Sequence, residues 1–134
     1  MLNKHDVLYL LIGGYAVTYY GYPRTTADMD IFIEKTETNI EKVLEVLRDF
    51  GFPKDSISKD IFFEKETIFR MGLPPLRIEL LTAISGVNFK SIFEKHNIVT
   101  IDNVEIKIID IESLKKNKKA SGRYKDLDDL EHLP

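Results

Sequence analysis

The sequence contains no cysteine among its 134 residues, so it has no disulfide, no thiolate zinc site and no cysteine nucleophile. No apolar run approaches the ~18 residues that a membrane-spanning helix needs. The apolar stretch at residues 7–12 lacks a small-residue cleavage pattern and precedes two glycines, which indicates a strand instead of a signal peptide. Positive charge is not in excess either, because 19 basic and 22 acidic side chains give a net charge of −3. These absences predict a cytoplasmic protein without membrane association and without a globally basic nucleic-acid surface.

One domain, spanning residues 1–134, is what the length allows, since a domain averages about 150 residues. No internal repeat, low-complexity segment or linker interrupts the chain, and its glycines and prolines fall between periodic stretches. Strand and helix signals follow one another without a regular alternation. This pattern predicts an α+β domain built on one mixed β-sheet.

Strand signals occur where β-forming residues cluster between turn residues, at residues 7–12, 28–33, 67–71, 77–82, 98–101 and 104–109. The last two flank Asp102-Asn103, which predicts a hairpin with a two-residue turn, whereas residues 67–71 and 77–82 are joined by either a hairpin or a short crossover. Helices are expected at residues 16–20, after a capping box of Thr38 and Glu41, after Asn88, after Asp110, and at residues 127–133. Residues 55–63 fit one helical turn.

The chemically informative feature is a pair of aspartates, Asp28 and Asp30, on one predicted strand. Residues two apart on a strand project from the same face, with Cα atoms roughly 7 Å apart. Two carboxylates placed together repel unless a cation holds them, and a hard divalent ion such as Mg²⁺ or Mn²⁺ prefers oxygen ligands. The pair therefore predicts a metal clamp. The alternative is that both side chains cap backbone N–H groups at a loop end.

Glu79 is a third acid, placed within the apolar strand at residues 77–82. An unpaired carboxylate is costly to bury, so it indicates a site unless this strand lies at an edge that faces solvent. If the strand lies beside residues 28–33, Glu79 joins the aspartates as a third metal ligand or as the base that deprotonates an attacking hydroxyl. Gly13-Gly14 then provides a turn where phosphate can approach the backbone. This combination predicts phosphoryl or nucleotidyl transfer.

These motifs, in this order, resemble the DNA polymerase β-type nucleotidyltransferase superfamily, and in particular its minimal members near the abortive-infection toxins. The resemblance covers residues 12–130. It implies the nucleotidyltransferase fold, one mixed sheet with helices packed mainly on one face. It also implies that Gly13 and Gly14 bind phosphate and that Asp28, Asp30 and Glu79 are the catalytic, metal-binding acids. The third acid is commonly Asp in this superfamily, so Glu79 is one methylene longer, and Gly14 stands where many members have Ser.

Several cations are candidates for phosphate contacts. Arg24 and Thr25 lie just before the aspartates, where Arg24 either contacts triphosphate oxygens or pairs with the aspartates themselves. A basic run follows at residues 115–125, which is either a solvated helix face or, because Gly122 breaks it, a segment that folds back. In the second case Lys119, Arg123 or Lys125 reaches phosphate or a nucleic-acid backbone.

The function that the resemblance implies is transfer of a nucleoside monophosphate from a triphosphate such as ATP to an acceptor hydroxyl, with Mg²⁺ or Mn²⁺. The acceptor is a protein, a tRNA end or a small molecule such as an antibiotic. A short chain leaves little surface for an acceptor domain, which favours a macromolecular acceptor, a homodimer or a partner protein. The alternative is a catalytically inactive module, or a toxin-antitoxin component, that docks a protein or RNA.

Overall fold

The computed structural model describes residues 2–22, 28–53, 56–64, 68–72 and 77–134. Within these residues one mixed sheet has the strand order β3-β4-β2-β1-β6-β5. Its strands are β1 (Tyr9–Ile12), β2 (Asp28–Ile33), β3 (Ile68–Met71), β4 (Arg77–Leu81), β5 (Asn97–Ile101) and β6 (Val104–Ile108). The β2–β4 and β1–β6 pairs are parallel, and the other neighbouring pairs are antiparallel. The predicted α+β fold on a mixed sheet is confirmed.

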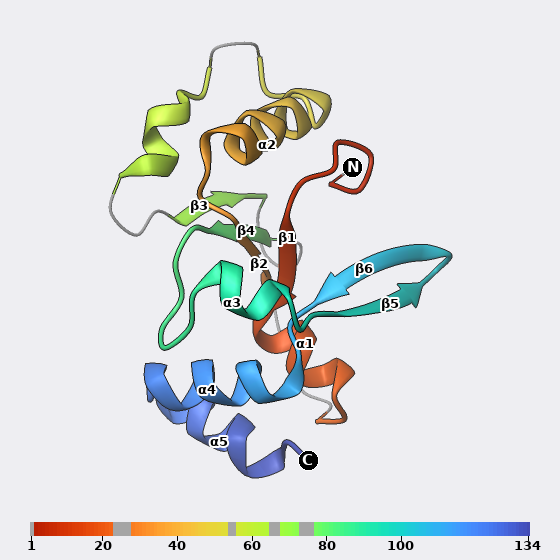
Figure 1. Cartoon of the computed structure of the whole chain (residues 1–134), viewed down its shortest axis with the longest axis vertical. Coiled ribbons are helices and arrows are strands. Elements are labelled where there is room, and N and C mark those ends of the chain that lie inside the picture. Colours follow the sequence, from red (N-terminus) through yellow and green to blue (C-terminus); the bar gives the residue numbers. More distant parts are fainter. Residues whose placement is uncertain (1, 23–27, 54–55, 65–67, 73–76) are drawn as a thin grey trace.

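The helices in the described ranges are α1 (Gly13–Tyr19), α2 (Glu37–Asp49), α3 (Phe89–Phe93), α4 (Ile111–Ser121) and α5 (Tyr124–His132), with a 3-10 turn η1 (Lys59–Phe63). In Figure 1, α2 lies at one end of the molecule and α4 and α5 lie at the other, with the sheet between them. None of these helices combines the length and apolar character needed to cross a membrane.

Alternating side chains along β2 divide the core into two clusters, one on each face of the sheet. Phe32 packs in the cluster that includes residues of α1, α3 and α4 and Leu133 just after α5. Ile31 and Ile33 pack in the other cluster, with α2 and η1. Most of the α-helices therefore share one side of the sheet, as predicted, while α2 and η1 cover the opposite side.

The start of α2 differs from the predicted capping box. Thr36, not Thr38, is the N-cap, and its side chain accepts a hydrogen bond of 3.3 Å from the backbone N–H of Asn39. Asn39 is itself buried and hydrogen-bonds both the N–H and the C=O of Leu8, so it ties α2 to the chain entering β1. This long-range contact favours Thr36 as the N-cap, and it cannot be read from the local sequence pattern.

Other boundaries shift by a few residues. The first helix begins at Gly13, directly after β1, so both glycines belong to it and no separate turn precedes it. The helix after Asn88 ends at Phe93, and the last helix begins at Tyr124 instead of residue 127. β3 and β4 pair antiparallel, which favours the hairpin over the crossover, although residues 73–76 lie outside the described ranges.

The predicted two-residue hairpin between β5 and β6 is confirmed. Asp102 and Asn103 have φ angles of 51° and 65°, as a turn with positive φ at both central residues requires. Asx residues tolerate this backbone region better than other non-glycine residues, so no glycine is needed. In Figure 1 the hairpin extends away from the body of the sheet.

Candidate functional site

The register of β2 against β4 brings the predicted acids together. The parallel pairing sets Asp30 beside Glu79 and Asp28 beside Arg77. Strand alternation then places all four side chains on one face, whereas Met29 and Ile78 between them point to the other face. The role of Glu79 depended on its strand lying next to residues 28–33, and the structure confirms this pairing.

Gly13 is required by the close approach of Asp30. Its φ is +68°, and a Cβ at this position would lie 2.5 Å from Oδ2 of Asp30. A side chain would thus both strain the backbone and collide with the carboxylate. The residue that begins α1 is therefore glycine because the acid sits against the main chain, a tertiary reason for the Gly-Gly pattern.

Asp30 is in an unfavourable environment for a charged group. Burial, a hydrogen bond with Glu79, and the negative charges of Glu79 and Asp28 raise the pKa of Asp30 to about 6, against which Lys125 acts only weakly. Its Oδ1 is buried and has no hydrogen-bond partner among the described residues. A carboxylate oxygen left unpaired in this way destabilises the fold unless a bound group satisfies it.

The two acids beside Asp30 are instead held by arginines. Arg77 donates from Nε to Oδ1 of Asp28 over 2.8 Å and from Nη2 to Oδ2 over 3.1 Å. This hydrogen bonding by Arg77 keeps the pKa of Asp28 below its usual range. Arg70 on β3 donates from Nε to Oε1 of Glu79 over 2.8 Å. Sequence reasoning did not single out Arg77 or Arg70, because their role depends on strand pairing.

The donor set of Asp28 and Asp30 suits a hard divalent cation. The buried, unpartnered Oδ1 of Asp30 beside a second aspartate is the kind of oxygen pair that Mg²⁺ or Mn²⁺ binds. Across the residues that the structure describes, however, no three His, Cys, Asp or Glu side chains gather as a metal-binding group. Glu79 interacts with Asp30 but also accepts a hydrogen bond from Arg70. A metal site made of all three acids thus stays a prediction. Of the three, the two aspartates are best suited to bind the cation.

A cavity of about 370 Å³ opens in front of these aspartates. Gly13, Gly14, Asp28 and Asp30 line it, together with residues from the loop after β4 and from the α4–α5 corner: Ser85, Asn117, Lys118, Ser121, Arg123 and Lys125. Carboxylates, cations and small polar groups thus line one space. Such a cavity can hold an anionic ligand between a bound cation and basic side chains.

A buried ion network shapes the basic side of the cavity. Lys118 is buried, and its Nζ lies 3.1 Å from carboxylate oxygens of both Asp126 and Asp129. Although burial opposes it, hydrogen bonds from Arg123, Ser121 and Lys118 hold the pKa of Asp126 well below its usual range. The network joins α4 to α5 and includes Arg123, which lines the cavity, as does Lys125.

The predicted phosphate contacts fall into three groups. Gly13, Gly14 and Arg123 line the cavity, as does Lys125. Lys119 is exposed on α4 and is not among the lining residues, because the helix turns the neighbouring Lys118 inward instead. Arg24 and Thr25 lie outside the described residues. The helical period of α4 shows that Lys118 and Lys119 point in different directions. It could identify Lys118 as the inward residue only if the face of α4 that packs against α5 had been known.

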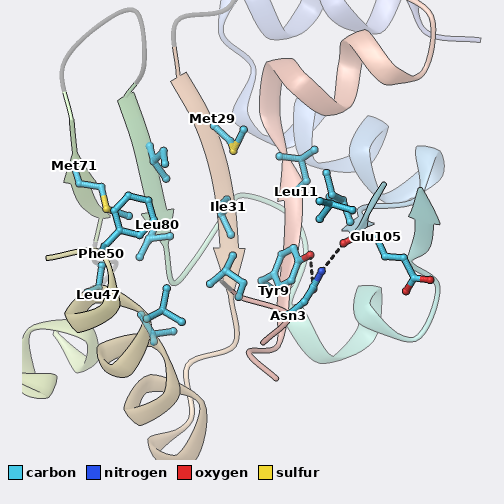
Figure 2. Close-up of a pocket in the computed structure, with 16 residues that line it drawn as sticks. Asn3, Tyr9, Leu11, Met29, Ile31, Leu47, Phe50, Met71, Leu80 and Glu105 are labelled. Atoms are coloured by element: carbon cyan, nitrogen blue, oxygen red, sulfur yellow. Dashed lines mark hydrogen bonds between the residues drawn. The ribbon is translucent and has the colours of Figure 1, made fainter. Parts of the chain in front are cut away.

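A second cavity, of about 290 Å³, lies on the opposite face of the sheet. Figure 2 shows Met29, Ile31, Leu80 and other apolar side chains along it, and Glu105 and Asn3 at one end. Asn3 donates to the backbone carbonyl of Glu105 and accepts from the Tyr9 hydroxyl, so these polar groups are already paired. This apolar cavity does not suit a phosphate ligand, and the acid-lined cavity is the candidate site.

The chain is thus an α+β domain with a cavity lined by acids and cations at its sheet. Over residues 1–134 the chain matches the family model described as nucleotidyl transferase of unknown function (DUF2204). The chain belongs to this family of nucleotidyl transferases. A search of curated proteins finds no match to the chain.

Proposed function

We propose that the protein moves the nucleoside monophosphate group of a nucleoside triphosphate to an acceptor hydroxyl, with Mg²⁺ or Mn²⁺ at Asp28 and Asp30. The family supports the reaction class. The observation that carries the proposal is the position of Asp30, whose Oδ2 lies against the glycine that begins α1 and whose Oδ1 is buried without a partner. The protein tolerates this carboxylate because a ligand, and not the fold, uses it.

The residues around the cavity divide the work between them. Gly13 and Gly14 line the cavity beside Asp30, and Arg123 and Lys125 supply positive charge to it. Asp28 and Asp30 would hold the cation, which when bound neutralises triphosphate charge and polarises the reacting phosphate. Glu79, beside Asp30, either accepts the proton of the attacking hydroxyl or completes the oxygen set.

The bond changes follow from this arrangement. The acceptor oxygen forms a bond to the α-phosphorus while the bond from that phosphorus to the bridging oxygen of the β-phosphate breaks. Pyrophosphate leaves with its electron pair, and the hydroxyl proton passes to a carboxylate or to water. The contribution of the chain is to hold both partners in line and to offset negative charge in a partly closed cavity.

Two radioactive labels test this proposal. The protein is incubated with each of four nucleoside triphosphates labelled at the α- or the γ-phosphate, with Mg²⁺ or Mn²⁺ and one acceptor pool: total cell protein, total tRNA or an aminoglycoside. We expect transfer of the α-label only, since the γ-label leaves with pyrophosphate. Asp30→Asn should abolish transfer, and Asp49→Asn, which changes an exposed aspartate on α2 that pairs with His5, should not.

Two results would overturn the proposal. Transfer of the γ-label would identify a kinase-type reaction. Metal-dependent nucleotide binding without transfer to any pool would favour the alternative, in which the domain is an inactive module that docks a protein or RNA. The acceptor pool that takes up the label names the substrate class.

A further inference from the structure

Arg77 covers the aspartate that should bind a cation. Its guanidinium contacts both carboxylate oxygens of Asp28, at 2.8 and 3.1 Å, and its Nε also lies 3.8 Å from Oε1 of Glu79. Asp30, between these two acids, has no such arginine in the described structure, and its Oδ1 stays without a partner. Arginine side chains therefore already supply positive charge next to Asp28 and Glu79, but not next to Asp30.

We propose that Arg77 is an exchangeable counter-ion of this site. In the absence of a divalent cation it holds Asp28, and when Asp28 takes a cation the guanidinium moves to a phosphate oxygen of the nucleotide. The inference rests on the proposed function and adds to it a phosphate-binding residue that also limits cation binding before the nucleotide arrives.

The chemistry of the guanidinium is what requires an exchange. Arginine stays protonated at any ordinary pH, so it cannot relieve repulsion from a nearby cation by losing its charge. Its planar fork already occupies both oxygens of Asp28. A divalent ion at those oxygens would be repelled by the unit positive charge that already contacts them, and at such close range repulsion is appreciable even in water. Arg77 must therefore move away from Asp28 before both oxygens of Asp28 can bind the cation.

The surroundings of Arg77 permit that movement. Its side chain is 33% exposed and that of Asp28 is 27% exposed, so neither is locked in the core. A guanidinium matches phosphate oxygens with the same two-pronged geometry that it uses for a carboxylate, so phosphate can replace Asp28 as its partner. By contrast, the buried Lys118 is held between two carboxylates and has no comparable freedom.

Arg77→Gln tests the exchange through two binding measurements that should change in opposite directions. Without nucleotide, Mn²⁺ affinity measured by electron paramagnetic resonance should rise roughly tenfold, because the unit positive charge that competes for Asp28 is removed. Affinity for the Mn²⁺ complex of α,β-methylene-ATP, measured by calorimetry, should fall at least about tenfold, because a charge-assisted hydrogen bond to phosphate is lost. A role for Arg77 in folding alone predicts no gain in Mn²⁺ affinity.

Matched variants separate this effect from overall charge and from misfolding. Lys59→Gln, on η1, which packs on the face of the sheet opposite the acids, removes an equal charge from an exposed ion pair with Glu37 and should change neither affinity. Arg77→Lys keeps the charge without the fork, so its Mn²⁺ affinity should stay closer to that of the wild type. Circular dichroism and thermal unfolding establish that each variant is folded.

The results distinguish failure of the exchange from failure of the proposed function. Suppose that the wild type binds the Mn²⁺–nucleotide complex, that Asp30→Asn does not, and that Arg77→Gln binds Mn²⁺ no more tightly than the wild type. The proposed exchange of Arg77 is then wrong and the proposed function stands. If nucleotide binding does not depend on Asp30, the proposed site is wrong. If neither wild type nor Arg77→Gln binds Mn²⁺ through Asp30, both proposals fall.

Discussion

Replacing Asp30 by Asn should stabilise the protein while abolishing its nucleotide binding. Burial and the neighbouring acids raise the pKa of Asp30 to about 6, which means that the fold disfavours its charged form. Above pH 6 the wild type must hold a carboxylate there, whereas in the unfolded chain the same group ionises freely. Asparagine has nearly the same shape and removes that electrostatic cost.

The magnitude follows from the shift in pKa. The difference between about 6 and the ordinary 3.8 corresponds to about 3 kcal/mol in the free energy of unfolding. Water at the open side of the cavity screens these charges, so we expect a gain of ~1–2 kcal/mol at pH 7.5. The wild type recovers this stability as the pH falls through 6, because protonation then removes the charge in the folded state. Below about pH 4 the two proteins should be equally stable.

Urea unfolding at a series of pH values measures this difference directly. Asp28→Asn is the matched comparison, since Arg77 lowers the pKa of Asp28 and the substitution should destabilise the protein at pH 7.5. The reasoning is refuted if Asp30→Asn is less stable than the wild type at pH 7.5, or if its gain does not change between pH 7.5 and 4.

Two further substitutions test the residues that hold the site in place. Gly13→Ala should lower the unfolding free energy by more than about 1 kcal/mol and abolish nucleotide binding, because the new Cβ meets a carboxylate at 2.5 Å. Gly21→Ala, also at positive φ but with no atom of the described residues within 4 Å of the new Cβ, should cost less when both variants are unfolded thermally. Lys118→Met should destabilise by about 3–5 kcal/mol in urea, since Asp126 and Asp129 lose their buried cation, and a loss below about 1 kcal/mol would contradict this.

The fold class and the acids of the candidate site could be proposed from sequence because they depend on short-range patterns. Alternation and turn residues located β2 and β4, and an acid within an apolar strand marked Glu79 before its neighbours were known. The hairpin turn at residues 102–103 was likewise predicted from local residue preferences, since both residues tolerate positive φ. The strand pairing that sets Glu79 beside Asp30 had to be assumed, and the structure supports that assumption.

Features that depend on contacts between distant segments were missed. Thr36 caps α2 in place of Thr38 because Asn39 reaches back to Leu8, and nothing in the local sequence encodes this contact. Lys118 faces inward instead of Lys119 because two aspartates of α5 lie opposite it. The pairing of Arg77 with Asp28 has the same origin, since it arises from the register of two strands 49 positions apart.

The central claim is that Asp28 and Asp30 form a cation-dependent nucleotide site. Isothermal titration of the protein with ATP, GTP, CTP and UTP, each with and without Mg²⁺ or Mn²⁺, tests it most directly, with Asp30→Asn as the control. We predict binding of at least one nucleotide that requires the cation and is lost in the variant, although the variant is the more stable protein. Binding that persists in Asp30→Asn, or no binding of any nucleotide to the wild type, would contradict the account.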